Sequence, residues 1–301
     1  MPRTFHQTLP FLAVVMLLVG CASGADHRQV PSSGPRASAS APPDPGAPSP
    51  AASSTTPSAS SRPPDEGSVF SVLTYNVYVG NDDVVGAARV VREADATVVC
   101  LQETFGASQQ VLRAELASAY PHIAFYVGKV GNGPGVLSKV PLVDGRYVPS
   151  SHGYNGYWVG KLTLHGRQVQ LANVHLHPTV PLGGLRGALR GWADAEAIRA
   201  AEIDEVVALL DPALPAVLAG DFNTPSSSAS YDRVIHHGFT DAFREGDAPP
   251  RGTPTFRGKL RGLPLPVRID YVFLRGGLHA LRSRVIEGSA SDHLPVHTTV
   301  H

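Results

Sequence analysis

The sequence predicts a mixed α/β domain in which much of the strand pairing is antiparallel. Short apolar runs typical of strands alternate with amphipathic helical segments, and few long helices interrupt the later strands. No internal repeat is visible. The apolar pattern predicts strands over residues 69–77, 97–102, 123–127, 135–138, 157–164, 168–175, 216–220, 267–274 and 296–300.

Three helices complete the expected elements. In the third, an apolar stripe that includes Ile203 and Val206 is predicted to pack on the core. Glu202, Asp204 and Glu205 are then expected to face solvent. The three helices are predicted over residues 82–94, 108–118 and 193–210.

Three segments of different composition organise the chain. Residues 1–21 have a basic start and an apolar run too short to span a bilayer comfortably, which is typical of an export signal. They end in Leu-Val-Gly-Cys21, which resembles the lipobox of bacterial lipoproteins, so Cys21 is the expected lipidation site; a secretory signal with an incidental Cys is the alternative. Residues 22–67, rich in Pro, Ser and Ala, are predicted to form a disordered tether. Residues 68–301 remain as the folded domain.

Cysteine content and net charge bear on two properties of the chain, disulfide bonding and the binding of duplex DNA. The two cysteines are Cys21 and Cys100, and Cys100 lies in an apolar run, so we expect an inert buried thiol and no disulfide. The 25 Lys and Arg residues balance the 25 Asp and Glu residues. This neutral balance argues against a large basic footprint for duplex DNA.

Six motifs with polar residues lie beside short apolar runs, as polar groups do when strands carry them to the edge of a sheet. Hard oxygen ligands together with neutral imidazoles suit magnesium-assisted chemistry on phosphate. The six motifs are Thr-Tyr-Asn76-Val, Leu-Gln-Glu103, Asn-Val-His175-Leu, Gly-Asp221-Phe-Asn223, Ile-Asp270-Tyr-Val and Ser-Asp292-His293-Leu-Pro.

In this order the six motifs resemble those of the endonuclease/exonuclease/phosphatase superfamily, which includes deoxyribonucleases, abasic-site endonucleases, neutral sphingomyelinases and inositol-polyphosphate 5-phosphatases. The resemblance covers about residues 68–301. It implies a four-layer α/β/β/α sandwich with two packed mixed, largely antiparallel sheets. It also implies an active site at one end of the sandwich, where loops from both sheets meet.

The resemblance implies a Mg²⁺ site, with Mn²⁺ as a possible substitute, and leaves one or two ions open. Glu103 would be the principal metal ligand, Asn76 would support metal or phosphate, and Asp292 would position a second ion or the attacking water. Outside its motif, Glu103 would be interpreted as a surface residue that starts a loop.

The same resemblance assigns the reacting groups. Asp221 would orient or deprotonate the attacking water, and Asn223 would stabilise the transition state; an ordinary turn before the following Pro is compatible with both roles. Asp270 would orient His293 against the phosphate. His175 would stabilise phosphate or protonate the leaving oxygen.

Substrate-binding residues are less marked. His177 is expected on the strand face of His175, at an exposed edge or in the same pocket. Arg257 and Arg268 belong to a basic stretch that precedes Asp270 and forms either a solvated loop or a grip on further phosphates. Residues 151–158 offer aromatic rings to a base or a lipid headgroup.

Three functions fit these features. The leading interpretation is a metal-dependent phosphodiesterase or endonuclease that acts outside the cytoplasm by direct water attack. The alternative is a sphingomyelinase-like phospholipid hydrolase or a phosphomonoesterase, and a noncatalytic surface binding protein comes third. We expect a monomer that meets nucleic acid or a phospholipid headgroup and is held to a bacterial membrane through its lipid anchor. That membrane would be the outer one in a two-membrane bacterium, and otherwise the cell membrane's outer face.

Overall fold

The structure is a computed structural model of the 301-residue chain. The expected signal peptide, Cys21 and the expected tether lie outside the residues that it describes. The described residues are 69–128, 132–164, 166–179, 184–260, 263–288 and 290–301.

The first of two six-stranded sheets has the order β13-β14-β1-β2-β4-β3. In this sheet β1 and β2 pair in parallel, and the other neighbouring strands pair antiparallel. Its strands are β1 Phe70–Asn76, β2 Val98–Phe105, β3 His122–Phe125, β4 Asn132–Ser138, β13 Ala280–Val285 and β14 Val296–Val300.

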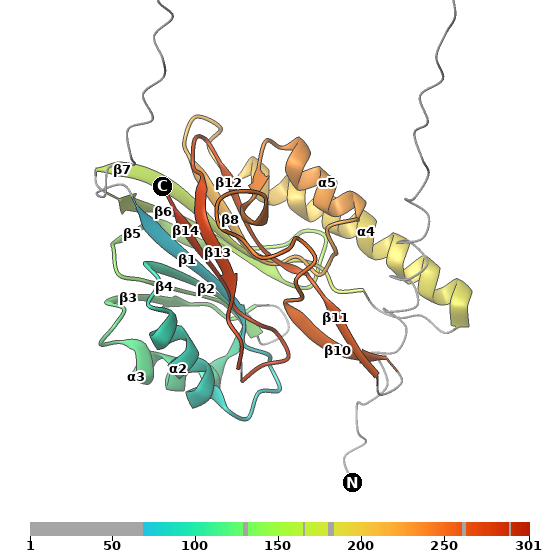
Figure 1. Cartoon of the computed structure of the whole chain (residues 1–301), viewed down its shortest axis with the longest axis horizontal. Coiled ribbons are helices and arrows are strands. Elements are labelled where there is room, and N and C mark those ends of the chain that lie inside the picture. Colours follow the sequence, from blue (N-terminus) through green and yellow to red (C-terminus); the bar gives the residue numbers. More distant parts are fainter. Residues whose placement is uncertain (1–68, 129–131, 165, 180–183, 261–262, 289) are drawn as a thin grey trace, which may run out of the picture.

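The second sheet has the order β5-β6-β7-β8-β12-β9, and only β7 and β8 pair in parallel. A separate hairpin of β10 and β11 projects beside it (Figure 1). These strands are β5 Leu142–Pro149, β6 Gly156–Leu164, β7 Arg167–His175, β8 Ala216–Asp221, β9 Thr240–Asp241, β10 Phe256–Leu260, β11 Leu263–Val267 and β12 Asp270–Arg275.

Helices cover the outer face of each sheet (Figure 1). Helix α2 begins where the Asp83 carboxylate accepts a hydrogen bond from the Gly86 amide at 2.8 Å, and α5 begins at the Ser228 cap. The helices α2 and α3 lie on the first sheet, and α4 and α5 lie on the second. Their bounds are α2 Val84–Ala94, α3 Gly106–Leu116, α4 Gly184–Ala208 and α5 Ala229–His236, with a short 3₁₀ helix over Ala242–Arg244.

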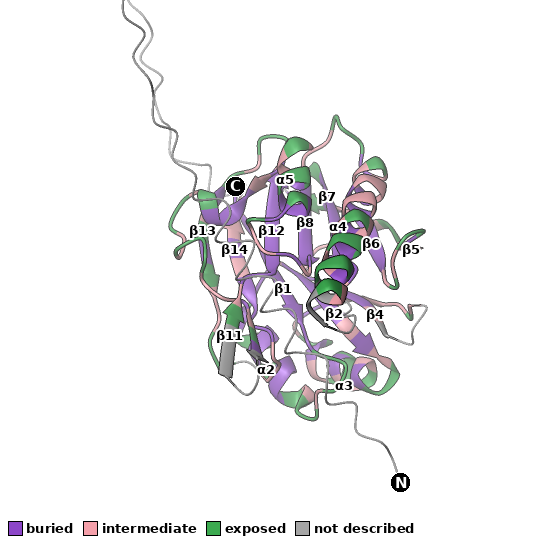
Figure 2. Ribbon diagram, turned by 90° about the vertical axis from the view of Figure 1, so that its right-hand side faces the viewer, coloured by how far each residue is buried: buried purple, intermediate pink, exposed green. Residues whose placement is uncertain are grey.

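Three apolar layers hold the four structural layers together, which confirms the predicted α/β/β/α sandwich. One layer lies between the two sheets, and one lies between each sheet and its helices. Figure 2 shows this buried interior under helices whose outer faces are exposed. Trp158, in the middle layer, is fully buried because Gly145 and Gly160 make room for its indole; a Cβ at either glycine would approach the ring to 2.6 or 2.5 Å. Burial of each Leu or Val contributes about 1.5–3 kcal/mol.

Several elements differ from their sequence-based predictions. Strands β5, β10, β11 and β13 and helix α5 were not predicted, and α4 begins at Gly184, well before the predicted start. Strand β5 is half-exposed along most of its length, so its apolar residues do not alternate regularly with polar ones. Among the described residues, no helix is long and apolar enough to cross a membrane.

The prediction that Glu202 faces solvent is wrong. Glu202 is fully buried, because the segments after β5 and β7 cover this face of α4. Asp204 and Glu205 are partly exposed, and Glu205 accepts a hydrogen bond from the Tyr157 hydroxyl at 2.9 Å.

Candidate active site

Strand register aligns three polar residues at one end of the second sheet. His175 at the end of β7 is the partner of Asp221 at the end of β8, and Asp221 is the partner of Asp270 at the start of β12. Side chains at paired positions of neighbouring strands lie on the same face of a sheet. The three residues therefore stand side by side.

The first sheet brings Glu103 to the same place by means of a β-bulge. The register between β2 and β4 shifts between Leu101 and Thr104, and Glu103 within this interval has φ 59°. A bulge redirects a side chain, and a positive φ is unfavourable for a residue other than glycine. The backbone at Glu103 is thus locally strained, and this conformation directs the carboxylate into the site.

Asn76 joins the two sheets across the site. Its amide nitrogen donates to Glu103 Oε1 and to Asp221 Oδ2, each at 3.0 Å. Its amide oxygen accepts a hydrogen bond from the Tyr78 backbone N–H at 3.0 Å. In this structure Asn76 therefore orients two carboxylates, whereas the sequence analysis expected it to support metal or phosphate.

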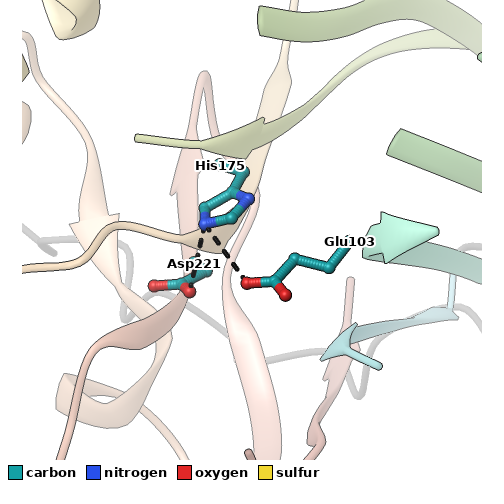
Figure 3. A group of neighbouring side chains, drawn as sticks. All are labelled: Glu103, His175 and Asp221. Atoms are coloured by element: carbon teal, nitrogen blue, oxygen red, sulfur yellow. Dashed lines mark ion pairs between the residues drawn. The ribbon is translucent and has the colours of Figure 1, made fainter. Parts of the chain in front are cut away.

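Glu103, His175 and Asp221 converge from β2, β7 and β8 and form the first candidate ligand group (Figure 3). His175 Nε2 lies 3.8 Å from Glu103 Oε1 and 3.6 Å from Asp221 Oδ2. Asp221 is buried, while Glu103 and His175 remain partly open to solvent. Two carboxylates and an imidazole with one open side fit a divalent cation that keeps positions for phosphate oxygens.

Asp221, Asp270 and His293 form the second group. His293 Nδ1 lies 2.9 Å from Asp270 Oδ2, and His293 Nε2 lies 3.7 Å from Asp221 Oδ2. The Phe256 ring covers the imidazole at a centroid distance of 4.8 Å. Asp221 therefore belongs to both groups, with the more open group on one side and the buried carboxylate–imidazole pair on the other.

Asp270 and His293 each favour the ionised form of the other. Burial by itself lowers the pKa of His293, but the negative charges of Asp270 and Asp221 outweigh this effect and raise that pKa to about 10. Burial raises the pKa of Asp270 to about 6, with the charge of His293 acting in the opposite direction. Nδ1 of His293 thus faces Asp270, and Nε2 faces Asp221.

The turn after β8 is locked in place. Gly220 has φ 149°, and a Cβ there would lie 1.9 Å from the Val174 carbonyl oxygen, so the position requires glycine. Phe222 is buried in the core, while Asn223, at φ 51°, donates its backbone N–H to Asp221 Oδ1 at 2.8 Å. The Asn223 side chain donates to the Leu176 carbonyl at 3.0 Å. The turn expected from sequence is present and fixes Asp221.

Asp292 lies near the site but in neither ligand group of the described residues. The Ser291 hydroxyl donates to its carboxylate at 3.3 Å. Burial raises the pKa of Asp292; His293 opposes this shift and the negative charge of Glu103 adds to it.

Arg268, which was expected to lie in a solvated loop or to bind substrate phosphate, is instead held inside the fold. Its guanidinium forms two hydrogen bonds to the Asp241 carboxylate, at 2.6 and 2.9 Å, and lies over the rings of Phe243 and Tyr271. The side chain is almost fully buried. The proposed grip of Arg268 on substrate phosphate is therefore wrong, because this charge is neutralised inside the fold.

Arg257 and His177 lie outside both ligand groups. Arg257 is exposed on β10 and pairs with Glu287, and its backbone N–H donates to the Asp292 carbonyl at 2.9 Å. His177 is buried against the Tyr154 ring at 4.6 Å, and its Nδ1 has no hydrogen-bond partner among the described residues.

Helix α4 contributes a largely buried polar network that was not predicted from the sequence. We call Glu196, Arg199 and Glu202 the α4 network. Arg199 donates to Glu196 at 2.6 Å and to the His177 carbonyl at 2.9 Å, while Glu202 accepts the His177 backbone N–H at 2.7 Å. Glu196 accepts the Thr224 hydroxyl at 2.9 Å.

The α4 network holds the segments that follow β7 and β8, and these strands end at His175 and Asp221. A signal for it exists in the sequence, because Arg199 and Glu202 fall at helical spacing between the apolar Ala195 and Val206. Charged residues on an apolar helix face indicate a buried polar network.

Comparison with known proteins agrees with this geometry. The sequence model of the "Endonuclease/Exonuclease/phosphatase family" matches residues 73–293. A Drosophila melanogaster protein named "Putative neutral sphingomyelinase" is 26% identical over 241 residues, which cover 69% of this chain and 52% of that protein. The chain thus spans about half the length of this curated relative.

Solved structures show the same fold. An endonuclease/exonuclease/phosphatase from Beutenbergia cavernae DSM 12333 superposes with a TM-score of 0.62 at 22% identity, covering 77% of this chain and 71% of that one. Sphingomyelinase C from Streptomyces griseocarneus superposes with a TM-score of 0.58 at 21% identity, and the match covers 77% of this chain and 99% of that one. Truncated Caenorhabditis elegans TDP2 superposes with a TM-score of 0.57 at 16% identity, and the match covers 77% of this chain and 97% of that one. The chain therefore belongs to the endonuclease/exonuclease/phosphatase family, whose members hydrolyse phosphate esters with the help of a divalent metal ion.

Proposed function

We propose that this protein is an exported, Mg²⁺-dependent phosphodiesterase, with Mn²⁺ able to replace Mg²⁺. The observation that supports this proposal most directly is the position of Asp221 between two groups of different chemistry. One group suits a cation next to phosphate oxygens, and the other carries a paired imidazole. A phosphoester placed over Asp221 would meet both.

The residues of the first group would hold the metal ion and the substrate. Glu103 and Asp221, with His175 beside them, would hold the cation, which would neutralise negative charge on the phosphate. His175 Nε2, partly open to solvent, is placed to donate to a phosphate oxygen or to the leaving oxygen.

The residues of the second group would handle the water and the developing charge. The Asp221 carboxylate would accept a hydrogen bond from the attacking water. Protonated His293, held by Asp270, would donate Nε2–H to a nonbridging oxygen of the phosphate. Asn223 uses one amide hydrogen on the Leu176 carbonyl and has a second available for the phosphate.

A phospholipid headgroup ester is the substrate class that we favour, and nucleic acid is the second candidate. The relative named for sphingomyelinase supports the lipid, as does the zero net charge, which provides no broad attraction to duplex DNA. Lipid anchoring at Cys21 would place the domain beside such a substrate, on the outer membrane or the outer face of the cell membrane. Incorporation of radiolabelled palmitate, lost in a Cys21→Ser variant, tests the anchor.

The test of function is a hydrolysis assay of the full-length protein in detergent. Its substrates are sphingomyelin, plasmid DNA, RNA and bis(p-nitrophenyl) phosphate, each with Mg²⁺, Mn²⁺ or EDTA. We expect sphingomyelin turnover that EDTA and a His293→Gln substitution both abolish. The matched substitution His236→Gln, at an exposed position on α5, should leave turnover unchanged. DNA cleavage without lipid turnover would move the assignment to a nuclease, and silence on all four substrates would contradict the proposed function.

A further inference from the structure

Two side chains of α4 hold the peptide groups on both sides of one residue just after β7. Glu202 Oε2 accepts the His177 backbone N–H at 2.7 Å, and Arg199 Nη1 donates to the His177 carbonyl oxygen at 2.9 Å. Arg199 and Glu202 lie three positions apart on α4, which covers the second sheet (Figure 1). We call these two hydrogen bonds the backbone clamp.

The backbone clamp completes a fixation of the chain that begins at His175. The pairing of β7 with β8 ends where His175 meets Asp221. The next residue, Leu176, is held on both sides by the turn after β8: its N–H donates to the Asp221 carbonyl at 2.9 Å, and its carbonyl accepts the Asn223 amide at 3.0 Å. His177 follows and is held by the backbone clamp. The backbone that leaves His175 is therefore fixed at two consecutive residues.

The backbone clamp is built from buried charge. Arg199 and Glu202 are both fully buried. Burying charged groups is costly, and apolar residues of similar volume in place of a buried ion pair are often neutral or stabilising. Packing of α4 on the sheet therefore does not by itself require these two side chains, whereas a fixed backbone position after β7 does.

The charges of the same two residues also interact with the first ligand group. Burial lowers the pKa of Arg199, and the charge of Asp221 is among the interactions that oppose this shift. Burial raises the pKa of Glu202, and the charge of His175 is among those that oppose it. The backbone clamp is thus linked to the site by charge as well as through the chain.

We infer that Arg199 and Glu202 are positioning residues for His175. The backbone clamp keeps the His175 imidazole beside Glu103 and Asp221, where it can serve the cation and the phosphate. The inference rests on the proposed function, which gives His175 that task. Arg199 and Glu202 are in neither ligand group of the described residues, so they act through His175. Loss of a residue that orients a metal ligand typically weakens metal affinity or activity about 10- to 100-fold.

The experiment is a double-mutant cycle on the full-length protein. It measures kcat/KM with Mg²⁺ on whichever of the four phosphodiesters named above the wild type hydrolyses fastest. Glu202→Leu removes the acceptor of the His177 N–H and should lower kcat/KM about 10- to 100-fold. In a His175→Ala background the same substitution should lower it less than about twofold, because the side chain that is positioned is absent.

Two further substitutions at single positions accompany the cycle. Glu202→Gln keeps an acceptor oxygen for the His177 N–H, so it should recover most of the activity that Glu202→Leu loses. Glu93→Leu, the same substitution at an exposed position of α2, should leave activity unchanged.

Mn²⁺ affinity gives a second readout that needs no turnover. Electron paramagnetic resonance of free Mn²⁺, without substrate, should show binding about tenfold weaker in Glu202→Leu and no further weakening when this substitution is added to His175→Ala. Arg199→Lys keeps a positive charge beside Glu196 but replaces the forked guanidinium that also holds the His177 carbonyl. It should give the same two results and carries the test if Glu202→Leu does not fold.

The outcomes separate this inference from the proposed function. Equal losses of kcat/KM and Mn²⁺ affinity with and without His175 would make Arg199 and Glu202 general supports of the fold, and would overturn the inference alone. Wild-type rates and Mn²⁺ affinity in Glu202→Leu and Arg199→Lys would do the same. No hydrolysis of any of the four phosphodiesters by the wild type would overturn both.

Discussion

Two clusters of buried charge lie close together in this molecule and have opposite compositions. The α4 network, Glu196, Arg199 and Glu202, contains its own cation, and its carboxylates accept hydrogen bonds from neighbouring loops. The site cluster combines three carboxylates, Glu103, Asp221 and Asp270, with two imidazoles. A cluster that supplies its own countercharge holds loops, whereas an acidic cluster open on one side is suited to bind a cation.

The pKa values show the same contrast. Burial acts to raise the pKa of Glu196, but Arg199 and Ser230 outweigh it and the pKa is lowered. Burial raises the pKa of Glu202, and the opposing hydrogen bonds from His177 and Ser150 do not reverse this shift. The two clusters are linked, because the charges of Asp221 and Arg199 interact, as do those of His175 and Glu202.

The largest effect is expected in the site cluster. Asp221→Asn removes the carboxylate that faces both imidazoles, so kcat/KM on the preferred substrate should fall about 10³- to 10⁴-fold. Circular dichroism should show an unchanged fold. The same substitution at exposed Asp211 is the matched control and should leave activity intact. A fall in kcat/KM of less than tenfold in Asp221→Asn would show that Asp221 is not essential for catalysis.

The next effect is on stability and belongs to the α4 network. Arg199→Met leaves the partly buried Glu196 without its cation and the His177 carbonyl without its buried donor, so the free energy of unfolding should fall by about 3–5 kcal/mol. Urea denaturation measures this change. Arg190→Met, at an exposed position of the same helix, should have little effect. Equal stability of the two variants would show that the network does not hold the fold.

Metal binding should stabilise the site cluster by a somewhat smaller amount. Mg²⁺ at 100 times its Kd should raise the free energy of unfolding by about 2.7 kcal/mol, and EDTA should reverse the gain. Glu103→Gln should lose most of this gain, because it removes one of the carboxylate ligands. Glu115→Gln, at a partly exposed position away from the site, is the control. Full Mg²⁺ stabilisation of the Glu103→Gln variant would place the ion elsewhere.

The smallest effect concerns Glu202. Because its pKa is raised, the native state holds a proton that the unfolded chain releases, so this group lowers stability as pH rises above about 4.5. Glu202→Gln should therefore cost about 1 kcal/mol at pH 4.5 and less at neutral pH. The pKa of Glu205 is lowered by Ser151 and Tyr157 against the effect of burial, so Glu205→Gln should show the opposite pH trend. Urea denaturation of both variants between pH 4.5 and neutral pH measures these trends. The same pH trend in both variants would contradict the opposite pKa shifts of Glu202 and Glu205.

The strands that carry the site could be predicted because they are buried along most of their length. The runs before Glu103, His175 and Asp221 are mostly apolar, which marks each run as a buried strand. The pairing of Asp270 with His293 followed from the family resemblance, and the structure places them in contact.

Other residues could not be placed from sequence, because their environment is made by distant segments. Arg268 belongs to a basic stretch, but its partner Asp241 lies on a strand too short to predict. Glu202 is covered by two loops that no helical pattern reveals.

The bridge that Asn76 makes between Glu103 and Asp221 has a consequence for folding. Asn76 and Asp221 lie 145 positions apart in the chain and on different sheets. Loop closure over such a distance is entropically expensive and slow, so the site should be completed only when the two sheets dock. Neither half of the domain contains the complete set of reacting groups. During refolding, activity should return together with global structure, and an incompletely folded chain would be harmless to the phosphate esters of the cell that makes it.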